Sequence, residues 1–167
     1  ISDANQVESL AGIMGGSHSG CTNETTDVFL EAAFFDPVRT AYTGRALKIN
    51  SDARYRFERG IDPAWTPTGV EAATQMIMDL CGGTPSDVVT AGQLPDHTRA
   101  YRLDTDRVQS LVGMEIAPQT QRDTLEALGF VMDGDMAQVP SWRPDVMGEA
   151  DLVEEVARIA SLSRLQG

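Results

Sequence analysis

The stretch from Leu30 to Pro63 constrains the fold of this chain more than any other, because it carries three successive helix-start signals. Each signal pairs a capping side chain with a residue suited to a first helical turn: Asp36-Pro37, Ser51-Asp52 and Asp62-Pro63. Gly60 suits the position just after a helix. The stretch therefore predicts a helix from Pro37 to about Asn50, a short second helix ending near Arg59, and a further element beyond Asp62.

The residues that precede these helices, Val28 to Phe35, form an apolar run typical of a β-strand, with one acid, Glu31, inside it. Burying an ionised carboxylate without a partner costs on the order of several kcal/mol. Glu31 therefore faces solvent from an edge strand, is paired, or serves as a buried acceptor for a ligand hydroxyl. Helix N-termini present free N–H groups to polar ligands. If they lie near Glu31, the stretch forms a polar pocket.

A glycine-rich turn, Ala11 to Gly16, lies at the end of a predicted strand from Val7 to Ile13. Gly12 and Gly15 permit positive φ angles or a close approach of the backbone to a ligand. A tight turn is the simpler interpretation, and the spacing matches neither a dinucleotide-binding glycine motif nor a P-loop. Ser51-Asp52-Ala53 is likewise explained by helix capping alone.

The rest of the chain predicts one more helix and then a second domain. Apolar spacing indicates a helix over 68–81, and a short strand is expected at 88–89. Residues 91–97 are predicted to be a linker. Beyond it we expect strand 99–103, helices 104–112 and 119–128, a hairpin of 130–132 and 136–139, and a last helix 148–161. The predicted fold is α+β: a mixed or antiparallel sheet with helices over 1–90, then a winged-helix-like α+β domain over 98–167.

Four acids gather at the start of the last helix: Asp145, Asp151, Glu154 and Glu155. The last three share one helix face. Mg²⁺ typically takes one or two carboxylates plus water molecules, so a hard-cation site is one interpretation. The simpler one is that acids in a first turn complement the helix dipole, with Arg158 as an ion-pair partner of Glu154.

Charge and composition limit the classes of function. The formal charge is −12, with 6 basic and 12 acidic residues up to residue 90 and 7 and 13 after it, so each part is −6. That balance argues against generic binding to nucleic-acid phosphates through a basic patch. Two cysteines form no disulfide framework, and no apolar run reaches the ~20 residues that span a bilayer. We expect a cytoplasmic protein with free thiols, and, since it begins with Ile1, a piece of a longer one.

Together these stretches resemble the β subunit of bacterial phenylalanyl-tRNA synthetases. The segments that carry the resemblance are LAGIMGG, VFLEAAFFDP, SDARYRFERGIDP, CGG, VPSWRPD and DLVEEVARI, in the order and spacing of that family. The resemblance implies that residues 1 to about 90 are the C-terminal part of the B3/B4 editing domain. Residues from about 97 onwards then correspond to the B5 domain.

The resemblance also implies an activity and a site. In that family the editing domain hydrolyses tyrosine wrongly attached to the phenylalanine tRNA, using a positioned water and the ribose hydroxyl of the substrate. The family's pocket falls here on Gly12, Gly15, Glu31, Ser51 and Ala53, with Ser51 in place of the usual threonine. Glu31 would accept a hydrogen bond from the phenol of tyrosine. Sites built on such a bond discriminate by roughly 10⁴–10⁵.

For the second domain, the resemblance places the family's Mg²⁺ ligands on Asp145, Asp151, Glu154 and Glu155, in a site shared with the α subunit of an α2β2 tetramer. The synthetase site, with ATP and phenylalanine, is expected to lie mostly in that other subunit. Two alternatives stay open. One is a tRNA- or partner-binding scaffold without hydrolytic activity, and the other is a metal-dependent module for subunit assembly.

Overall fold

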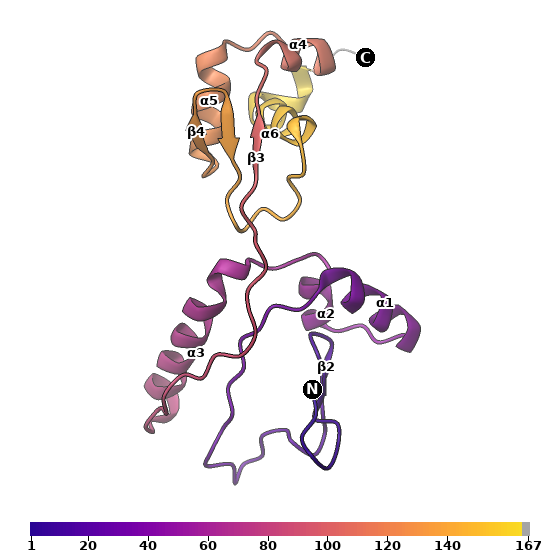
Figure 1. Cartoon of the computed structure of the whole chain (residues 1–167), viewed down its shortest axis with the longest axis vertical. Coiled ribbons are helices and arrows are strands. Elements are labelled where there is room, and N and C mark those ends of the chain that lie inside the picture. Colours follow the sequence, from indigo (N-terminus) through magenta and orange to yellow (C-terminus); the bar gives the residue numbers. More distant parts are fainter. Residues whose placement is uncertain (165–167) are drawn as a thin grey trace. The chain divides into compact units, whose positions relative to one another are not determined.

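The computed structural model describes residues 1–164 (Figure 1). The chain forms two compact units, the first Ile1–Pro95 and the second beginning at Asp96, so the division falls inside the segment predicted to be a linker. Helices and small antiparallel sheets occur together, which confirms the predicted α+β class. Among the described residues, no helix combines the length and apolar character needed to cross a membrane.

The first unit forms its helices where the capping signals predict them. Helix α1 spans Pro37–Leu47, and the Asp36 carboxylate accepts a hydrogen bond from its first turn. Helix α2 spans Asp52–Phe57 and is capped by the Ser51 hydroxyl. The 3-10 helix η1, Pro63–Trp65, then leads into α3, Thr66–Cys81. The predicted end of α1 near Asn50 is three residues too late, because Lys48 adopts a left-handed conformation and ends the helix.

The strands predicted for this unit are largely wrong. Residues 28–35 and 88–89 form no strand, and the side chain of Phe29 is 96% exposed. The predicted strand from Val7 to Ile13 shrinks to β1, Ser9–Leu10, which pairs with β2, Met14–Gly15. A strand requires a hydrogen-bonded neighbour. The described part of the chain places none beside residues 28–35, so the apolar pattern there has no sheet to join.

The first unit buries little apolar surface. Within residues 1–95, the buried apolar side chains are Ile13, at 2% exposure, and Pro63 at the start of η1. The rings of Phe35 and Phe57 pack against each other with centroids 5.1 Å apart but are only half-buried. Helix α3 has an apolar stripe and no buried residue. This unit therefore relies on capping and on polar contacts between its segments more than on a core.

The second unit has the predicted order of elements. Its three-stranded antiparallel sheet is ordered β3-β5-β4, with Tyr101 opposite Ala137 and Ala137 opposite Met132. The strands are β3 (Ala100–Arg102), β4 (Val131–Asp133) and β5 (Met136–Gln138), and the helices are α4 (Asp106–Val112), α5 (Pro118–Ala127) and α6 (Glu149–Ser161), followed by the 3-10 helix η2 (Leu162–Arg164). Sheet and helices together give the small α+β domain that the sequence predicts.

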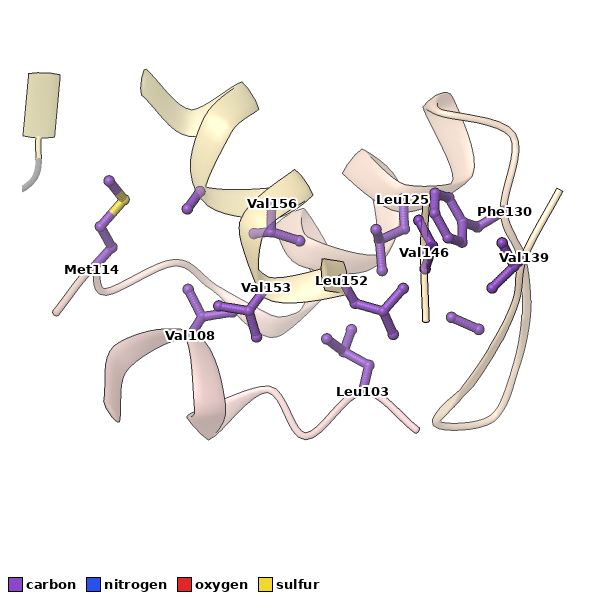
Figure 2. Close-up of a cluster of buried hydrophobic side chains, with 12 residues drawn as sticks. Leu103, Val108, Met114, Leu125, Phe130, Val139, Val146, Leu152, Val153 and Val156 are labelled. Carbon is purple, nitrogen blue, oxygen red and sulfur yellow. The ribbon is translucent and has the colours of Figure 1, made fainter. Parts of the chain in front are cut away.

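A continuous apolar cluster forms the core of the second unit. Figure 2 shows Leu152, Val153 and Val156 of α6 extending into the same cluster as Val108 of α4 and Leu125 of α5. These five side chains are at most 1% exposed. Each such residue contributes about 1.5–3 kcal/mol on burial. Helix α6 is therefore the central element of this unit, and its position fixes where its acids lie.

We expect Leu152→Ala to lower the free energy of unfolding of the second unit by about 2–5 kcal/mol, because it leaves a cavity at a fully buried position. Ile159→Ala is the matched control on the same helix, since Ile159 is 51% exposed. It should change stability by less than about 0.5 kcal/mol. Denaturant unfolding followed by Trp142 fluorescence in a Trp65→Phe background measures both. Equal effects of the two changes would contradict the assigned core.

Candidate functional site

A pocket of about 610 Å³ lies in the first unit and is lined by several separate segments of the chain, among them residues 61–69 around η1. The glycine-rich turn, the residues before α1 and the start of α2 each contribute to its wall. All five residues that the sequence points to line it: Gly12, Gly15, Glu31, Ser51 and Ala53. The structure thus brings together residues that are up to 41 positions apart, from Gly12 to Ala53.

The Ser51 hydroxyl joins two of these segments. It caps α2 by accepting a hydrogen bond of 3.1 Å from the backbone N–H of Arg54. It also donates a hydrogen bond to the carbonyl oxygen of Ile13, which lies in the glycine-rich turn. The N–H of Ile13 in turn donates to the carbonyl of Leu10 over 2.8 Å and closes that turn. Ser51 therefore holds the start of α2 against the glycine-rich turn.

Gly12 meets two requirements that other residues do not. Its φ of +66° lies in the left-handed region, where side chains are disfavoured. A Cβ at this position would also lie 2.9 Å from Cδ2 of Phe35 and 3.2 Å from Cγ of Phe57. Gly15 differs, because a Cβ there would meet nothing within 4 Å. The two aromatic rings thus come directly under the Gly12 backbone and form an apolar floor.

Glu31 lines the pocket but is not buried. Its side chain is exposed, so the expectation of a buried acid is wrong for this chain. The physical reason is the missing strand: residues 28–35 lie outside the sheets of the described residues, which leaves the Glu31 side chain uncovered. The other acid of the lining, Asp62, uses its carboxylate to cap η1 by accepting a bond of 2.9 Å from the N–H of Ala64. Within residues 1–164, Glu31 makes no hydrogen bond or ion pair, so its carboxylate can accept one from a ligand.

The sequence analysis missed several residues of this wall. Phe35, Phe57, Trp65 and Thr66 all line the pocket. The Thr66 hydroxyl is a buried polar atom with no hydrogen-bond partner in the described part of the chain. Buried polar groups are usually paired, so this hydroxyl is a candidate ligand contact. The signal that could have revealed Thr66 is its place beside Pro67, which suits the first turn of a helix.

The four acids at the start of α6 do not form a cluster able to hold a metal ion among the described residues. Arg143 binds two of them, with Nη2 2.6 Å from Oδ2 of Asp145 and 3.1 Å from Oε1 of Glu155. Arg158 binds Glu155 as well, at 2.6 Å. Asp151 accepts a hydrogen bond of 2.7 Å from the N–H of Met147. The carboxylates of Asp145, Asp151 and Glu155 are thus engaged by arginines and backbone. The side chain of Glu154 is exposed, and Arg158 forms its ion pair with Glu155 rather than with Glu154 as the simpler interpretation predicts.

Proton affinities at this cluster follow from the same contacts. Hydrogen bonds from Arg143 hold the pKa of Asp145 below its ordinary value of 3.8. Burial is the largest influence on Glu155 and raises its pKa, but hydrogen bonds from Arg143 and Arg158 together outweigh burial and bring the pKa below 4.5. The pKa of Arg143 is raised, chiefly by its hydrogen bonds to Asp145 and then to Glu155. All three groups are therefore charged at neutral pH.

Arg99 is a second arginine that the sequence analysis did not single out. Its guanidinium donates to three backbone carbonyls in the stretch before α6: Arg143 at 2.8 Å, Pro144 at 3.1 Å and Val146 at 2.9 Å. These bonds fix the irregular stretch that carries Asp145. The position of that acid therefore depends on Arg99, which immediately precedes β3, as well as on α6.

Comparison with known proteins gives two domain matches. Residues 1–82 match the B3/4 domain, and residues 101–161 match the tRNA synthetase B5 domain. Over its whole length the chain is 69% identical to the phenylalanine–tRNA ligase beta subunit of Cereibacter sphaeroides and 67% identical to that of Ruegeria pomeroyi. Over 95% of its length it is 54% identical to that of Paramagnetospirillum magneticum.

The chain belongs to the phenylalanine–tRNA ligase beta-subunit family. It covers 21% of the length of the first two relatives, about a fifth. The pocket lies within the B3/4 match, and the arginine-bound acids lie within the B5 match. The resemblance drawn from the sequence motifs is thereby confirmed.

We expect Gly12→Ala to destabilise the first unit by more than about 1 kcal/mol, because alanine is disfavoured at positive φ and its Cβ would press on Phe35. Gly15→Ala is the control, since open space surrounds that position. Amide hydrogen exchange across residues 9–15 measures both changes. Faster exchange in the Gly15 variant than in the Gly12 variant would contradict the packing described.

A second prediction concerns acid. Because the folded-state pKa of Glu155 is lowered, its contribution to stability is present above about pH 4.5 and is lost as the pH falls through the lower folded value. Glu155→Gln should therefore flatten the loss of stability of the second unit below that pH. Glu154→Gln, an exposed neighbour on the same helix, is the control and should leave the acid slope as in the wild type. Thermal unfolding between pH 3 and pH 7, roughly the span of carboxylate titration, provides the measurement.

Proposed function

We propose that this chain supplies part of an editing site that hydrolyses tyrosine mischarged onto the phenylalanine tRNA. The observation that carries the proposal is the convergence of Glu31, Ser51, Ala53 and the glycine-rich turn on one pocket. Membership of the beta-subunit family supports it. The pocket volume falls within the range of about 300–1,000 Å³ typical of small-molecule sites.

The lining suits an aromatic side chain that carries a hydroxyl. Phe35 and Phe57 offer an apolar floor for a ring. The carboxylate of Glu31 is uncommitted and accepts a hydrogen bond from a phenol, which phenylalanine lacks. The Thr66 hydroxyl offers a further polar contact. The small side chain of Ala53 leaves room for tyrosine in the pocket, and a larger residue there would exclude it.

The exposure of Glu31 sets the strength of this discrimination. A hydrogen bond to a charged group contributes about 1.5–3 kcal/mol, and more is gained only when the unpaired acceptor is cut off from water. In this chain the acid is exposed. A selectivity near the upper end of the roughly 10⁴–10⁵ expected from the family therefore requires that residues 28–35 be covered further in the complete subunit. The chain therefore accounts for the direction of the preference for tyrosine and for part of its size.

In the proposed reaction a water molecule adds to the carbonyl carbon of the aminoacyl ester. The bond between that carbon and the ribose oxygen breaks, and the ribose oxygen takes up a proton that derives from the water. Free tyrosine and a tRNA with a free ribose hydroxyl result. The lining contributes no histidine, cysteine, lysine or arginine within the described residues, so its role is to bind and orient the substrate.

Magnesium does not fit the acids of the second unit as they stand in this chain. Asp145 and Glu155 are already neutralised by Arg143 and Arg158. No step of the proposed reaction passes through a metal. In the complete protein we propose the partners that a beta subunit implies, an alpha subunit and the phenylalanine tRNA. We propose that ATP-dependent attachment of phenylalanine takes place in that larger assembly.

Deacylation assays of the complete enzyme test the proposal. We expect Glu31→Ala to reduce the ratio of kcat/KM for tyrosyl-tRNA over phenylalanyl-tRNA by about 10- to 100-fold, the value of one hydrogen bond to a charged group. Glu71→Ala, an exposed acid on α3 outside the pocket, is the control and should preserve the ratio.

Two outcomes of this assay would count against the proposal. An unchanged ratio in the Glu31 variant would remove this residue as the reader of the hydroxyl. Absence of any tyrosyl-tRNA deacylation by the wild type would favour the scaffold alternative, in which the unit binds tRNA or a partner without hydrolysis.

A further inference from the structure

We propose that Arg54, whose side chain lies against Gly44 of α1, is a positioning residue that sets the geometry of the pocket wall. The inference rests on the proposed function, because the pocket it concerns is the proposed editing site. Arg54 does not line the 610 Å³ pocket itself. It acts through Ser51, which does.

The side chain of Arg54 is held from three directions. Its Nε lies 2.9 Å from Oε2 of Glu58, one turn further along α2. Its Nη1 donates to the carbonyl of Ile49 at 2.7 Å and to Oδ1 of Asn50 at 3.0 Å. The side chain is 11% exposed. A guanidinium is a planar, rigid donor, so these bonds together fix its plane.

Gly44 makes this placement possible. It is buried in the last turn of α1, and a Cβ at this position would come within 2.9 Å of Cζ of Arg54 and closer still to its Nε and Cδ. Glycine inside a helix is destabilising relative to alanine. Its presence at this site is explained by the space that the Arg54 side chain occupies. The contact ties α1 to α2 directly.

The bonds of Arg54 lead to the pocket on both sides of Ser51. On one side the Arg54 side chain binds Ile49 and Asn50, the two residues that immediately precede Ser51. On the other, the backbone N–H of Arg54 donates to the Ser51 hydroxyl, which donates to the carbonyl of Ile13. The turn that carries Ser51 is therefore clamped at both ends, and the glycine-rich turn is attached to it.

These bonds also commit the hydroxyl group of Ser51. Its one hydroxyl proton is directed to Ile13, and its oxygen already accepts from Arg54. The hydroxyl thus holds the wall together and has no proton left to donate to a ligand. Specificity for the phenol then falls to Glu31, while Arg54 and Ser51 keep the wall at the right distance from it.

Five variants of the complete enzyme test this inference: Arg54→Gln, Arg54→Lys, Gly44→Ala, the double variant of Arg54→Gln and Gly44→Ala, and Arg56→Gln as the control. Arg56 is an exposed arginine two positions along the same short helix, so its replacement removes the same charge. A misplacement of about 1 Å can cost on the order of 10²-fold in rate. We expect Arg54→Gln and Gly44→Ala each to lower kcat/KM for tyrosyl-tRNA deacylation by at least about tenfold.

Three comparisons separate positioning from general destabilisation. Phenylalanine attachment by the same preparations should be unchanged. The double variant should be no slower than the slower single variant, because both changes break one contact. Arg54→Lys, which can restore one of the bonds, should recover part of the rate. Additive losses, or equal losses with Arg56→Gln, would overturn the inference.

A second measurement is independent of catalysis. In the 167-residue chain, amide NMR signals of residues 12–15 should shift in Arg54→Gln as they do in Ser51→Ala, and should stay in place in Arg56→Gln. Signals that change only within α1 and α2 would show that Arg54 does not reach the pocket wall. A wild-type enzyme that fails to deacylate tyrosyl-tRNA would count against the proposed function, while these shifts would still decide the role of Arg54.

Discussion

The hydroxyl of Ser51 holds the first unit together at the point where its function is proposed to lie. One oxygen atom caps α2 and also binds the carbonyl of Ile13 in the glycine-rich turn. Ile13 is almost fully buried, so the bond ties the helix to a buried apolar side chain of this unit. The pocket exists because two segments that are distant in the sequence are fixed at this atom.

The two units achieve order in different ways. The second has a core of buried side chains gathered around α6, and its hairpin and helices cover that core. The first has little buried apolar surface and depends on caps, on the Arg54 contacts and on Ser51. Polar contacts of this kind contribute about 1 kcal/mol each, less than burial of a large side chain. A site built on them is sensitive to small displacements, which suits a pocket that must distinguish two amino acids by one oxygen.

In the second unit, charged side chains also hold segments of the chain together. Asp145 and Glu155, which the sequence presents as part of a possible cation site, are both bound by Arg143, and Glu155 is bound by Arg158 as well. Arg99 fixes the backbone of residues 143–146. Arginine serves this purpose well because its planar group binds carboxylates at two points and stays charged. The cluster joins α6 to the stretch before it, and in the described chain it has a structural explanation that needs no metal ion.

The helices and the family could be predicted from the sequence. Capping residues and apolar spacing act over a few positions, and the sequence motifs of the family are distinctive. Asp36, Ser51 and Gly113 mark helix boundaries within a residue or two of where they occur. The strands of the first unit could not be predicted in this way, since a strand depends on a neighbouring strand that local sequence does not specify. Likewise, acids that share a helix face look alike whether arginines or a cation bind them. The partners of Glu155, the exposure of Glu31 and the contact between Arg54 and Gly44 join residues from different elements, so only the tertiary structure could decide them.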